Sequence, residues 1–441
     1  MIKKKRFSRI FFGWWTVLAG GFLGLWVAGY SIYGFSALFK PIASEFGFSR
    51  AVTASATSIG RLLGGFQSPV TGWISDRFGS KSILMVGAFL FGLGLILMNF
   101  INSLWAFYAV WGILVGIGAN ITMNLPIDKT ITNWFVKKRG IAISTKWTLA
   151  GLGGVVVLPL VVAPILATEG WRIACVTGGL VMWFAGLPLI WFLVKQRRPE
   201  FYGLLPDGAY TETEPATDTA RTIDRGIKYA AEVQEIEFTL RQAMRTPAYW
   251  LLIVAQVGYG AASSSLITHF IPFVTDMGIN PVRAAVMLGI MSFTAIPTRL
   301  IAGLIVDRLK KGHLRFLLGV AYLIQAIGIS SFLLNQTIAT VYVFYILYYF
   351  GFGISLPLIS IIRGRYFGRK GFGSIQGTSM MFMTPVQVVA PIYLGWVYDT
   401  SGSYTTAFAL IAGLLAFSSV IMSLIFPPKP PARVTDIGDI V

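Results

Sequence analysis

The chain alternates between long apolar runs and short charged segments along its whole length. A membrane-spanning helix needs about 20 predominantly apolar residues, and twelve of these runs satisfy that requirement. Glycines are frequent within them, and small residues let helices approach each other closely in a bilayer. The pattern predicts an all-α membrane protein with transmembrane helices at 12–38, 51–74, 82–101, 104–127, 140–166, 172–194, 248–275, 282–306, 314–334, 338–361, 373–398 and 405–426.

One long polar stretch, residues 195–246, interrupts this pattern midway and contains nine acidic residues. It predicts a cytoplasmic linker with a short amphipathic helix near residues 238–245. The predicted domains are therefore an N-terminal six-helix bundle (1–194), the linker, and a C-terminal six-helix bundle with a short cytoplasmic tail (247–441).

Composition supports a membrane location. Of 441 residues, 55% are hydrophobic and 12% are charged, whereas soluble domains carry about 25% charged residues. The net charge of +18 could indicate nucleic-acid binding, but the basic residues lie between apolar runs rather than on a polar domain, so we exclude that partner. The single cysteine, Cys175, excludes an intramolecular disulfide and a cysteine metal cluster.

The basic residues also predict the orientation. With the N-terminus inside, 29 of the 36 Lys and Arg residues lie on the cytoplasmic side and four on the other side. Cytoplasmic loops of membrane proteins carry such an excess, so both termini are expected in the cytoplasm and the chain in the cell's inner membrane. The first apolar run is long and lacks a small-residue cleavage site, which predicts a retained helix rather than a signal peptide.

The sequence contains an internal repeat. The segment 72–77, Gly-Trp-Ile-Ser-Asp-Arg, matches Gly-Leu-Ile-Val-Asp-Arg at 303–308, 231 residues later. Further matches begin at Trp134 and Gly170, each shifted by 232 residues. A constant shift through three separate loops predicts two duplicated halves, and parallel duplicated halves are typical of one large class of secondary transporters.

These motifs resemble the major facilitator superfamily. GWISDRFGSK at 72–81 is similar to its loop motif G-x-L-x-D-R-x-G-R-K, with serine at the usual arginine position 80. NWFVKKRGIAIS at 133–144, AGLGG at 150–154 and Arg299 ahead of 303–308 resemble the monocarboxylate transporter and oxalate–formate antiporter family. The resemblance implies the major facilitator fold, with twelve helices in two six-helix bundles.

Arg299 is the foremost candidate for substrate binding. A charge at a helix centre costs about 2.5–3.5 kcal/mol on insertion scales, so intramembrane ions usually serve a function. A guanidinium can hold a carboxylate by two parallel hydrogen bonds, which lysine cannot reproduce. The resemblance implies this role, because the family uses an arginine at this position. The alternative is a structural role, through snorkelling or pairing with Asp307.

Further substrate-binding candidates are polar residues within the predicted helices. Asn120 and Asn124 lie on one helical face with Asp128, and the resemblance implies that this region contacts substrate; the alternative is bonding to neighbouring helices. Lys146 is interpreted as snorkelling to the headgroups, or else as a second positive charge in the cavity. The remaining candidates are Arg61 and Tyr33. The alternative for Arg61 is a structural role, in which it hydrogen-bonds to helix-end carbonyls or to a tyrosine.

Two residues are candidates for proton coupling, His269 and Asp128. A histidine titrates near physiological pH, although a lone interfacial histidine is more often simply hydrogen-bonded, and Asp128 could instead pair with a neighbouring lysine. The aspartate and lysine that couple protons in eukaryotic relatives are replaced here by Ala295 and Tyr33. The second cation of the oxalate–formate antiporter corresponds to Thr384, which disfavours a dicarboxylate.

The loop motifs predict a conformational latch. They resemble the family's cytoplasmic contacts, which hold the outward-facing state. The predicted latch residues are Gly72, Asp76, Arg77, Gly79, Asp307 and Arg308.

These observations predict a secondary transporter that moves a small organic anion, first of all a monocarboxylate, by alternating access with proton symport. The expected partners are a small carboxylate, a proton and membrane lipid, and the protein is expected to be a monomer. No nucleotide-binding loop, metal cluster or catalytic triad is recognised, so we expect no enzyme activity, cofactor or metal. The alternatives are a dicarboxylate or aromatic-acid carrier, an anion exchanger, a non-transporting membrane sensor and an integral-membrane enzyme.

Overall fold

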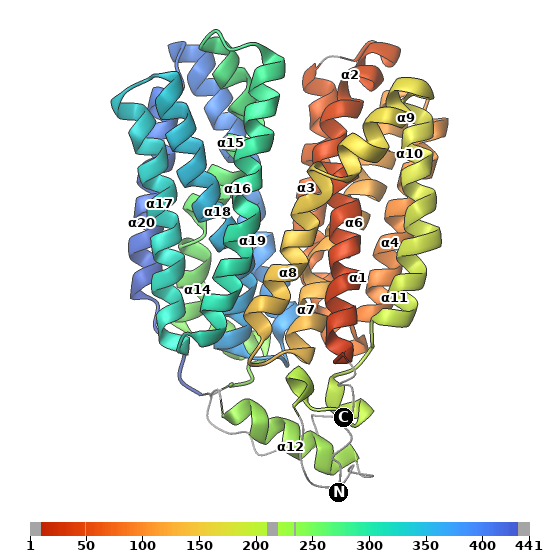
Figure 1. Ribbon diagram of the computed structural model, residues 1–441, viewed down its shortest axis with the longest axis vertical. Helices are drawn as coiled ribbons and strands as arrows, with labels where there is room; N and C mark the ends of the chain where they lie inside the picture. Colours follow the sequence, from red (N-terminus) through yellow and green to blue (C-terminus); the bar gives the residue numbers. More distant parts are fainter. Residues whose placement is uncertain (1–9, 49, 210–218, 233–234, 431–441) are drawn as a thin grey trace, which may run out of the picture.

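The computed structural model describes residues 10–48, 50–209, 219–232 and 235–430. Throughout these residues the regular secondary structure is helical and contains no strand. Two bundles of long helices stand side by side, and shorter linker helices lie beneath them (Figure 1). We call this end of the molecule the linker end and the opposite end the distal end.

The first bundle is built from long rods, several of which contain a π-helical turn between two α-helical parts. Its helices are α1 (Phe12–Val27), α2 (Phe35–Phe46), α3 (Arg50–Phe78), α4 (Ser80–Leu97), α5 (Leu104–Phe107), α6 (Gly116–Met123), α7 (Leu125–Trp134), α8 (Arg139–Gly151), α9 (Ala163–Thr168), α10 (Gly170–Val181) and α11 (Leu187–Leu193).

The second bundle contains longer uninterrupted helices. They are α14 (Pro247–Val254), α15 (Val257–Asp276), α16 (Pro281–Arg308), α17 (Leu314–Leu334), α18 (Ile338–Phe367), α19 (Phe372–Ser401) and α20 (Thr405–Leu424).

Ten helical segments of the described chain are long and apolar enough to cross a membrane. Two further helices, α3 and α16, have 29 and 28 residues and are more polar. Each of these two packs across the boundary between the bundles, α3 against α19 and α16 against α8, so part of its surface faces protein rather than lipid. The twelve predicted spans all coincide with helices, and the predicted all-α fold is confirmed.

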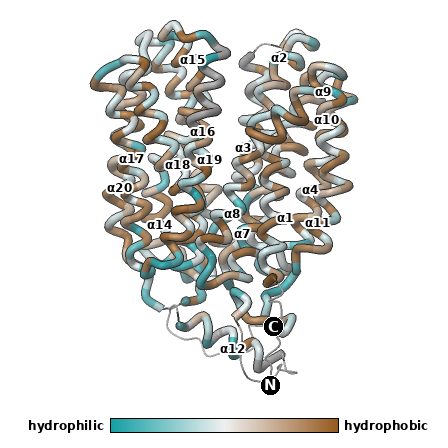
Figure 2. Tube along the Cα trace, in the orientation of Figure 1, coloured by the Kyte–Doolittle hydropathy of each residue, from teal (hydrophilic) through white to brown (hydrophobic). Residues whose placement is uncertain are grey.

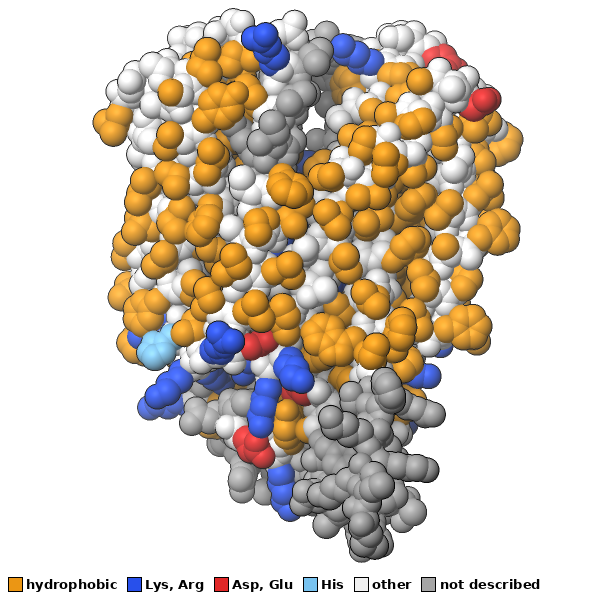
Figure 3. Space-filling view, in the orientation of Figure 1, with side chains coloured by type: hydrophobic (Ala, Val, Ile, Leu, Met, Phe, Trp, Pro, Cys, Tyr) orange, Lys and Arg blue, Asp and Glu red, His pale blue; other side chains and the backbone are white. Residues whose placement is uncertain are grey.

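The outer surface matches a bilayer environment. Hydrophobic residues, brown in Figure 2, make up most of both bundles. Hydrophobic side chains also form a broad band across the visible face (Figure 3). Charged side chains gather mainly at the linker end of that face (Figure 3). The surface therefore has the apolar girdle that a membrane-embedded protein needs.

The described part of the linker contains more helix than its polar composition suggests. It contains α12 (Thr219–Ala231) and α13 (Leu240–Met244), and Thr239 with Gln242 forms a capping box at the start of α13. The short helix predicted near 238–245 corresponds to α13, whereas sequence analysis missed α12.

Candidate functional site

Two matching contacts close the linker end of the boundary between the bundles. In the first, the Asp76 carboxylate at the end of α3 accepts hydrogen bonds from the backbone N–H groups of Gly373 (3.0 Å) and Ser374 (2.7 Å) at the start of α19. Asp76 also pairs with the buried Lys129. A carboxylate at a helix N-terminus is stabilised by the unpaired N–H groups and the helix dipole.

The second contact repeats the first with the bundles exchanged. The Asp307 carboxylate at the end of α16 accepts from the backbone N–H groups of Gly140 (2.6 Å) and Ile141 (2.9 Å) at the start of α8. Asp76 and Asp307 are the equivalent residues of the two sequence repeats. The duplication therefore yields two symmetric contacts, each carrying one carboxylate across the boundary.

Glycines let the helix backbones approach closely at both contacts. A Cβ atom on Gly72 would lie 2.2 Å from the carbonyl oxygen of Gly373, and one on Gly303 would lie 2.8 Å from that of Gly140. Real Cβ atoms essentially never show contacts under 3.0 Å. Any larger residue would therefore force these helices apart.

The other predicted latch residues do not cross the boundary. Arg77 is exposed and its guanidinium lies 5.6 Å from the centroid of the Trp73 ring. Gly79 has a φ of +84° and packs against Gln196. Arg308 is exposed at the end of α16. The aspartates and Gly72 make the contacts between the bundles, while Arg77, Gly79 and Arg308 lie beside them.

A buried ion cluster from the linker adds to the closure, and sequence analysis missed it. Glu235 pairs with Arg139 of the first bundle (2.7 Å) and approaches Arg369, between α18 and α19 (3.5 Å). Arg369 also pairs with Glu200 (2.9 Å). Burial opposes ionisation of Glu235, but the charges of Arg139 and Arg369 outweigh it and lower the pKa of this carboxyl.

At the distal end the bundles stand apart, and Figure 3 shows a hollow between them. Deeper along the same boundary lies a cavity of about 240 Å³. Its lining comes from both bundles, with Arg61, Asn120, Asn124 and Trp147 on one side and Arg363 among the residues of the other. The molecule is thus closed at the linker end, hollowed at the distal end, and carries a polar cavity between.

Arg299 lies next to this cavity. Its side chain is 5% exposed and donates a 3.0 Å hydrogen bond to the carbonyl oxygen of Trp147, which lines the cavity. The Nε atom of Arg299 has no hydrogen-bond partner. No carboxylate among the described residues pairs with the Arg299 guanidinium. Nor does it pair with Asp307, which is bound to the start of α8.

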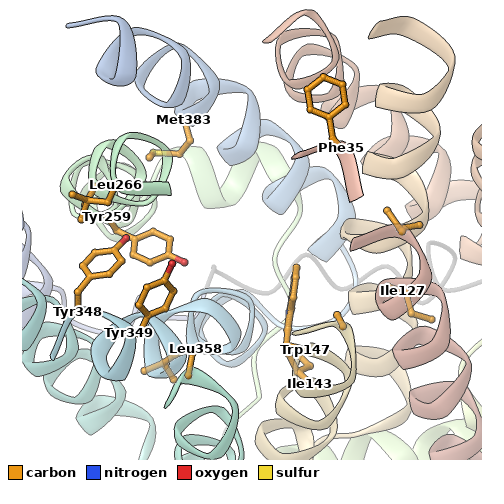
Figure 4. Close-up of a cluster of buried hydrophobic side chains, with 14 of the residues drawn as sticks. Phe35, Ile127, Ile143, Trp147, Tyr259, Leu266, Tyr348, Tyr349, Leu358 and Met383 are labelled. Atoms are coloured by element: carbon orange, nitrogen blue, oxygen red, sulfur yellow. The ribbon is translucent and has the colours of Figure 1, made fainter. Parts of the chain in front are cut away.

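Tyrosines surround the Arg299 guanidinium. It interacts electrostatically with Tyr33, Tyr259 and Tyr349. Figure 4 shows the hydroxyls of Tyr259 and Tyr349 converging in the space that faces Trp147. Hydroxyls around an unpaired guanidinium can complete the hydrogen bonding of a bound carboxylate.

Two arginines line the cavity directly. Arg61 on α3 is an exposed residue, and no hydrogen bond or ion pair joins it to the described residues. Arg363 on α18 is 3% exposed and donates to Gln256 Oε1 (2.8 Å). Sequence analysis missed Arg363, because the tenth span was predicted to end at residue 361 and Arg363 was grouped with the cytoplasmic charges. The helix continues to Phe367, which carries Arg363 into the boundary between the bundles.

The interpretation of Lys146 as a snorkelling residue is wrong. Lys146 is fully buried and forms an ion pair with the equally buried Asp128 (3.0 Å). This also corrects the expectation that Asp128 pairs with a neighbouring lysine. Ser360 of the second bundle donates to Asp128 (2.8 Å), and Gln376 donates to Ser360 (3.1 Å). Burial of a charge is costly without such partners, which explains why Lys146 turns inward.

The side-chain amides of Asn120 and Asn124 both line the cavity. Asn120 Oδ1 accepts from Gln67 (3.3 Å) and Ser68 (3.4 Å) of α3. Asn124 sits at the break between α6 and α7, where its ψ of −110° departs from helical values. Broken helices at a transporter midplane commonly line a binding site.

His269 lies apart from these residues, within the second bundle. Its Nε2 lies 2.9 Å from the carbonyl oxygen of Pro391, and its Nδ1 lies 3.3 Å from the Tyr404 hydroxyl. A neutral imidazole satisfies both contacts, with Nε2 donating and Nδ1 accepting. The structure therefore brings Asp128, but not His269, to the boundary between the bundles.

Two repeated helical bundles around a polar cavity, closed at one end, are typical of membrane transporters. The chain matches the family model described as Major Facilitator Superfamily over residues 21–384, and it belongs to this family. The members of this family are transporters rather than enzymes.

Individual relatives agree with this assignment. The chain is 24% identical to monocarboxylate transporter 12-B of Danio rerio over 369 residues, covering 80% of this chain and 75% of the relative. It is 23% identical to the oxalate:formate antiporter of Oxalobacter formigenes over 408 residues, covering 90% and 87%. Among solved structures, the proton:xylose symporter XylE superposes with a TM-score of 0.70 at 14% identity, covering 93% of this chain and 95% of that one; this likeness shows the fold alone.

Proposed function

We propose that this protein is a secondary transporter of a small organic anion, and that the favoured substrate is a monocarboxylate. The observation that carries the proposal is Arg299, a buried guanidinium beside the cavity with no carboxylate partner among the described residues. A bound carboxylate would supply the missing countercharge by a two-point contact. The printed names of the relatives, a monocarboxylate transporter and an oxalate:formate antiporter, support the same ligand chemistry.

In the proposed mechanism, two domains, residues 1–194 and 247–441, rock against each other around the cavity and open it to one side of the membrane at a time. The linker joins the two domains. The excess of basic residues at the linker end favours a cytoplasmic location for that end and for both termini, in the inner membrane. On this orientation, the closed contacts of Asp76 and Asp307 correspond to an outward-facing state. The apolar girdle is bound by membrane lipid, and one chain contains the whole cavity, which favours a monomer.

Proton symport is the favoured coupling mode. An inside-negative membrane opposes entry of an anion by about 2.3 kcal/mol per elementary charge per 100 mV, and a co-transported proton cancels that charge. Asp128 is the favoured carrier, because it touches both bundles and Ser360, its partner, lines the cavity. Protonation of Asp128 would leave the Lys146 ammonium without its countercharge, and the ammonium would then attract an incoming carboxylate. His269 lacks such a connection, since both of its nitrogens are engaged within the second bundle.

The test is uptake of radiolabelled carboxylates by the purified full-length protein in proteoliposomes. The pH difference and the membrane voltage are clamped separately, and the Arg299→Gln variant is the control. We expect uptake of at least one small carboxylate, accelerated by an inward proton gradient and lost in the variant.

Two results would contradict parts of this proposal. Uptake that does not depend on the pH difference but requires an anion preloaded inside the vesicles would identify an exchanger and reject symport. Binding of carboxylates without any uptake or exchange would identify a non-transporting sensor.

A further inference from the structure

We infer that Arg363, together with Gln256, forms a second anion-binding subsite at the linker end of the cavity. The consequence is that a dicarboxylate with its two acidic groups at opposite ends binds more tightly than the monocarboxylate of equal length. This inference rests on the proposed function, because both concern the same cavity.

The first support is the charge balance of the cavity wall. The described residues that line it include two guanidinium groups, Arg61 and Arg363, and no carboxylate. The nearby charges of Lys146 and Asp128 cancel in their ion pair. Arg299, beside the wall, adds a third uncompensated positive charge. One carboxylate cannot balance this excess, whereas a dianion balances two of the three charges.

The second support is the unfinished hydrogen bonding around Arg363. Its partner Gln256 is 3% exposed, and Gln256 Nε2 has no hydrogen-bond partner. Buried polar groups are normally paired, so this free N–H group can donate to a polar ligand. The charged neighbour and a free amide donor together suit an anionic oxygen.

The third support is the surroundings of Arg363. Arg363 lies near the side chains of Tyr249 and Tyr322, and no acidic residue of the described chain pairs with it. A buried charge without a partner is costly. The neutral surroundings leave room for a countercharge from a ligand.

The fourth support is the depth at which each arginine lies. Gly65 of α3 packs against Thr384 of α19, whereas Ser360 of α18 bonds to Gln376, two turns closer to the linker end of α19. Arg61 lies one turn on the distal side of Gly65, and Arg363 lies about one turn on the linker side of Ser360. The guanidinium groups therefore approach one cavity from opposite ends, which suits a ligand with a charge at each end. The volume of about 240 Å³ favours a small ligand, since pockets for drug-sized ligands measure about 300–1,000 Å³.

The experiment compares matched pairs of acids, such as butanedioate with butanoate and hexanedioate with hexanoate. Affinities are measured by calorimetry on the purified full-length protein, for the wild type and for Arg363→Gln, Arg363→Lys and Arg308→Gln. The last variant is the matched control, because Arg308 is exposed and lies outside the cavity.

We expect the wild type to bind at least one dicarboxylate about tenfold or more tightly than its monocarboxylate partner, as a charge-assisted hydrogen bond allows. Arg363→Gln should lower dicarboxylate affinity about tenfold and monocarboxylate affinity much less, so that the preference disappears; an unfolding temperature close to that of the wild type verifies that the variant folds. Arg363→Lys should retain part of the preference, because it keeps the charge, and Arg308→Gln should behave as the wild type.

Two outcomes would overturn the inference while leaving the proposed function intact. One is monocarboxylate binding by the wild type without any dicarboxylate preference. The other is an equal loss of both affinities in Arg363→Gln, which would indicate a structural role. If the wild type binds neither class of acid, the proposed function itself fails.

Discussion

Ser360 of α18 donates a 2.8 Å hydrogen bond to the carboxylate of Asp128 in α7, and this contact joins the two bundles at the depth of the cavity. Asp128 is at the same time the ion-pair partner of Lys146. One carboxylate thus takes part both in the charge balance of the first bundle and in the boundary that must open during transport. A change of its protonation state would act on both.

The first prediction concerns this carboxylate. Asp128→Asn should abolish the acceleration of net uptake by an inward proton gradient, because the amide cannot take up the proton. Exchange of internal for external substrate should persist, since it needs no net proton movement. Both rates are measured in proteoliposomes with the pH difference and the voltage clamped.

His269→Gln serves as the control and should keep the proton dependence of the wild type. Asp128→Asn also leaves Lys146 buried without its partner, which costs about 3–5 kcal/mol. The double variant Asp128→Asn with Lys146→Met should therefore recover thermal stability. Normal proton dependence in Asp128→Asn would reject Asp128 as the carrier.

The second prediction concerns the geometry of carboxylate binding. Arg299→Lys should lower the specificity constant for uptake about tenfold or more, because an ammonium cannot make the planar two-point contact of a guanidinium. Transport is measured in proteoliposomes, and size-exclusion chromatography verifies folding. The matched change Arg308→Lys, on the exposed end of the same helix, should have no effect. Wild-type rates in Arg299→Lys would remove Arg299 from the site.

The third prediction concerns the closed linker end. Asp76→Asn should slow turnover more than it weakens substrate binding, because Asp76 bonds to the start of α19 rather than lining the cavity. It should also raise the reactivity of a Ser144→Cys label. Ser144 is fully buried against Gly303 at the opposite contact, so a rigid rocking motion exposes it when either contact weakens.

The labelling experiment uses a Cys175→Ser background, although Cys175 is itself buried. Unchanged labelling with an undiminished turnover would show that Asp76 does not hold the closed state. A loss of affinity at equal turnover would place Asp76 in the binding site instead.

The fourth prediction concerns pH and the linker cluster. The pKa of Glu235 is lowered in the folded protein, so its contribution to stability is complete above its unfolded-state pKa of about 4.3. The contribution is lost as the pH falls through the lower folded-state value. Thermal unfolding in detergent should show this acid-induced loss in the wild type and a smaller one in Glu235→Gln.

At neutral pH, Glu235→Gln should lower the free energy of unfolding by about 3 kcal/mol, because it removes one partner from a buried cluster. Glu232→Gln is the matched control, since Glu232 pairs with Lys137 in an exposed position and should change stability by less than about 1 kcal/mol. Equal effects of the two variants would contradict the assigned role of Glu235.

The positions of the helices could be predicted from sequence, because hydropathy reports directly on contact with lipid. The fourth and tenth predicted spans nevertheless end too early, because α7 and α18 extend to Trp134 and Phe367. Both extensions carry a charged residue whose partner lies on another element: Asp128 pairs with Lys146 of α8, and Arg363 donates to Gln256, the residue before α15. A charged residue lowers the average hydropathy of its segment, although a partner on another helix makes the charge tolerable in the membrane. A prediction from hydropathy therefore ends the helix too early.

The site was predictable only in part for a related reason. Arg61, Asn120 and Asn124 could be named because polar residues inside apolar runs stand out, and the structure places them on the cavity. The pairing of Lys146 with Asp128 joins two consecutive helices, and the linker cluster around Arg369 joins residues far apart in the sequence. Such pairings depend on how the helices pack, which a single sequence does not specify.

The glycine contacts described above offer a practical tool for isolating the opposite state of this transporter. A single methyl group, introduced by Gly72→Ala, would act as a wedge against the carbonyl oxygen of Gly373. The same wedge at Gly303 would act on the second contact. Because each wedge penalises the closed arrangement and spares the cavity, the two variants provide conformationally trapped antigens for raising state-selective antibodies.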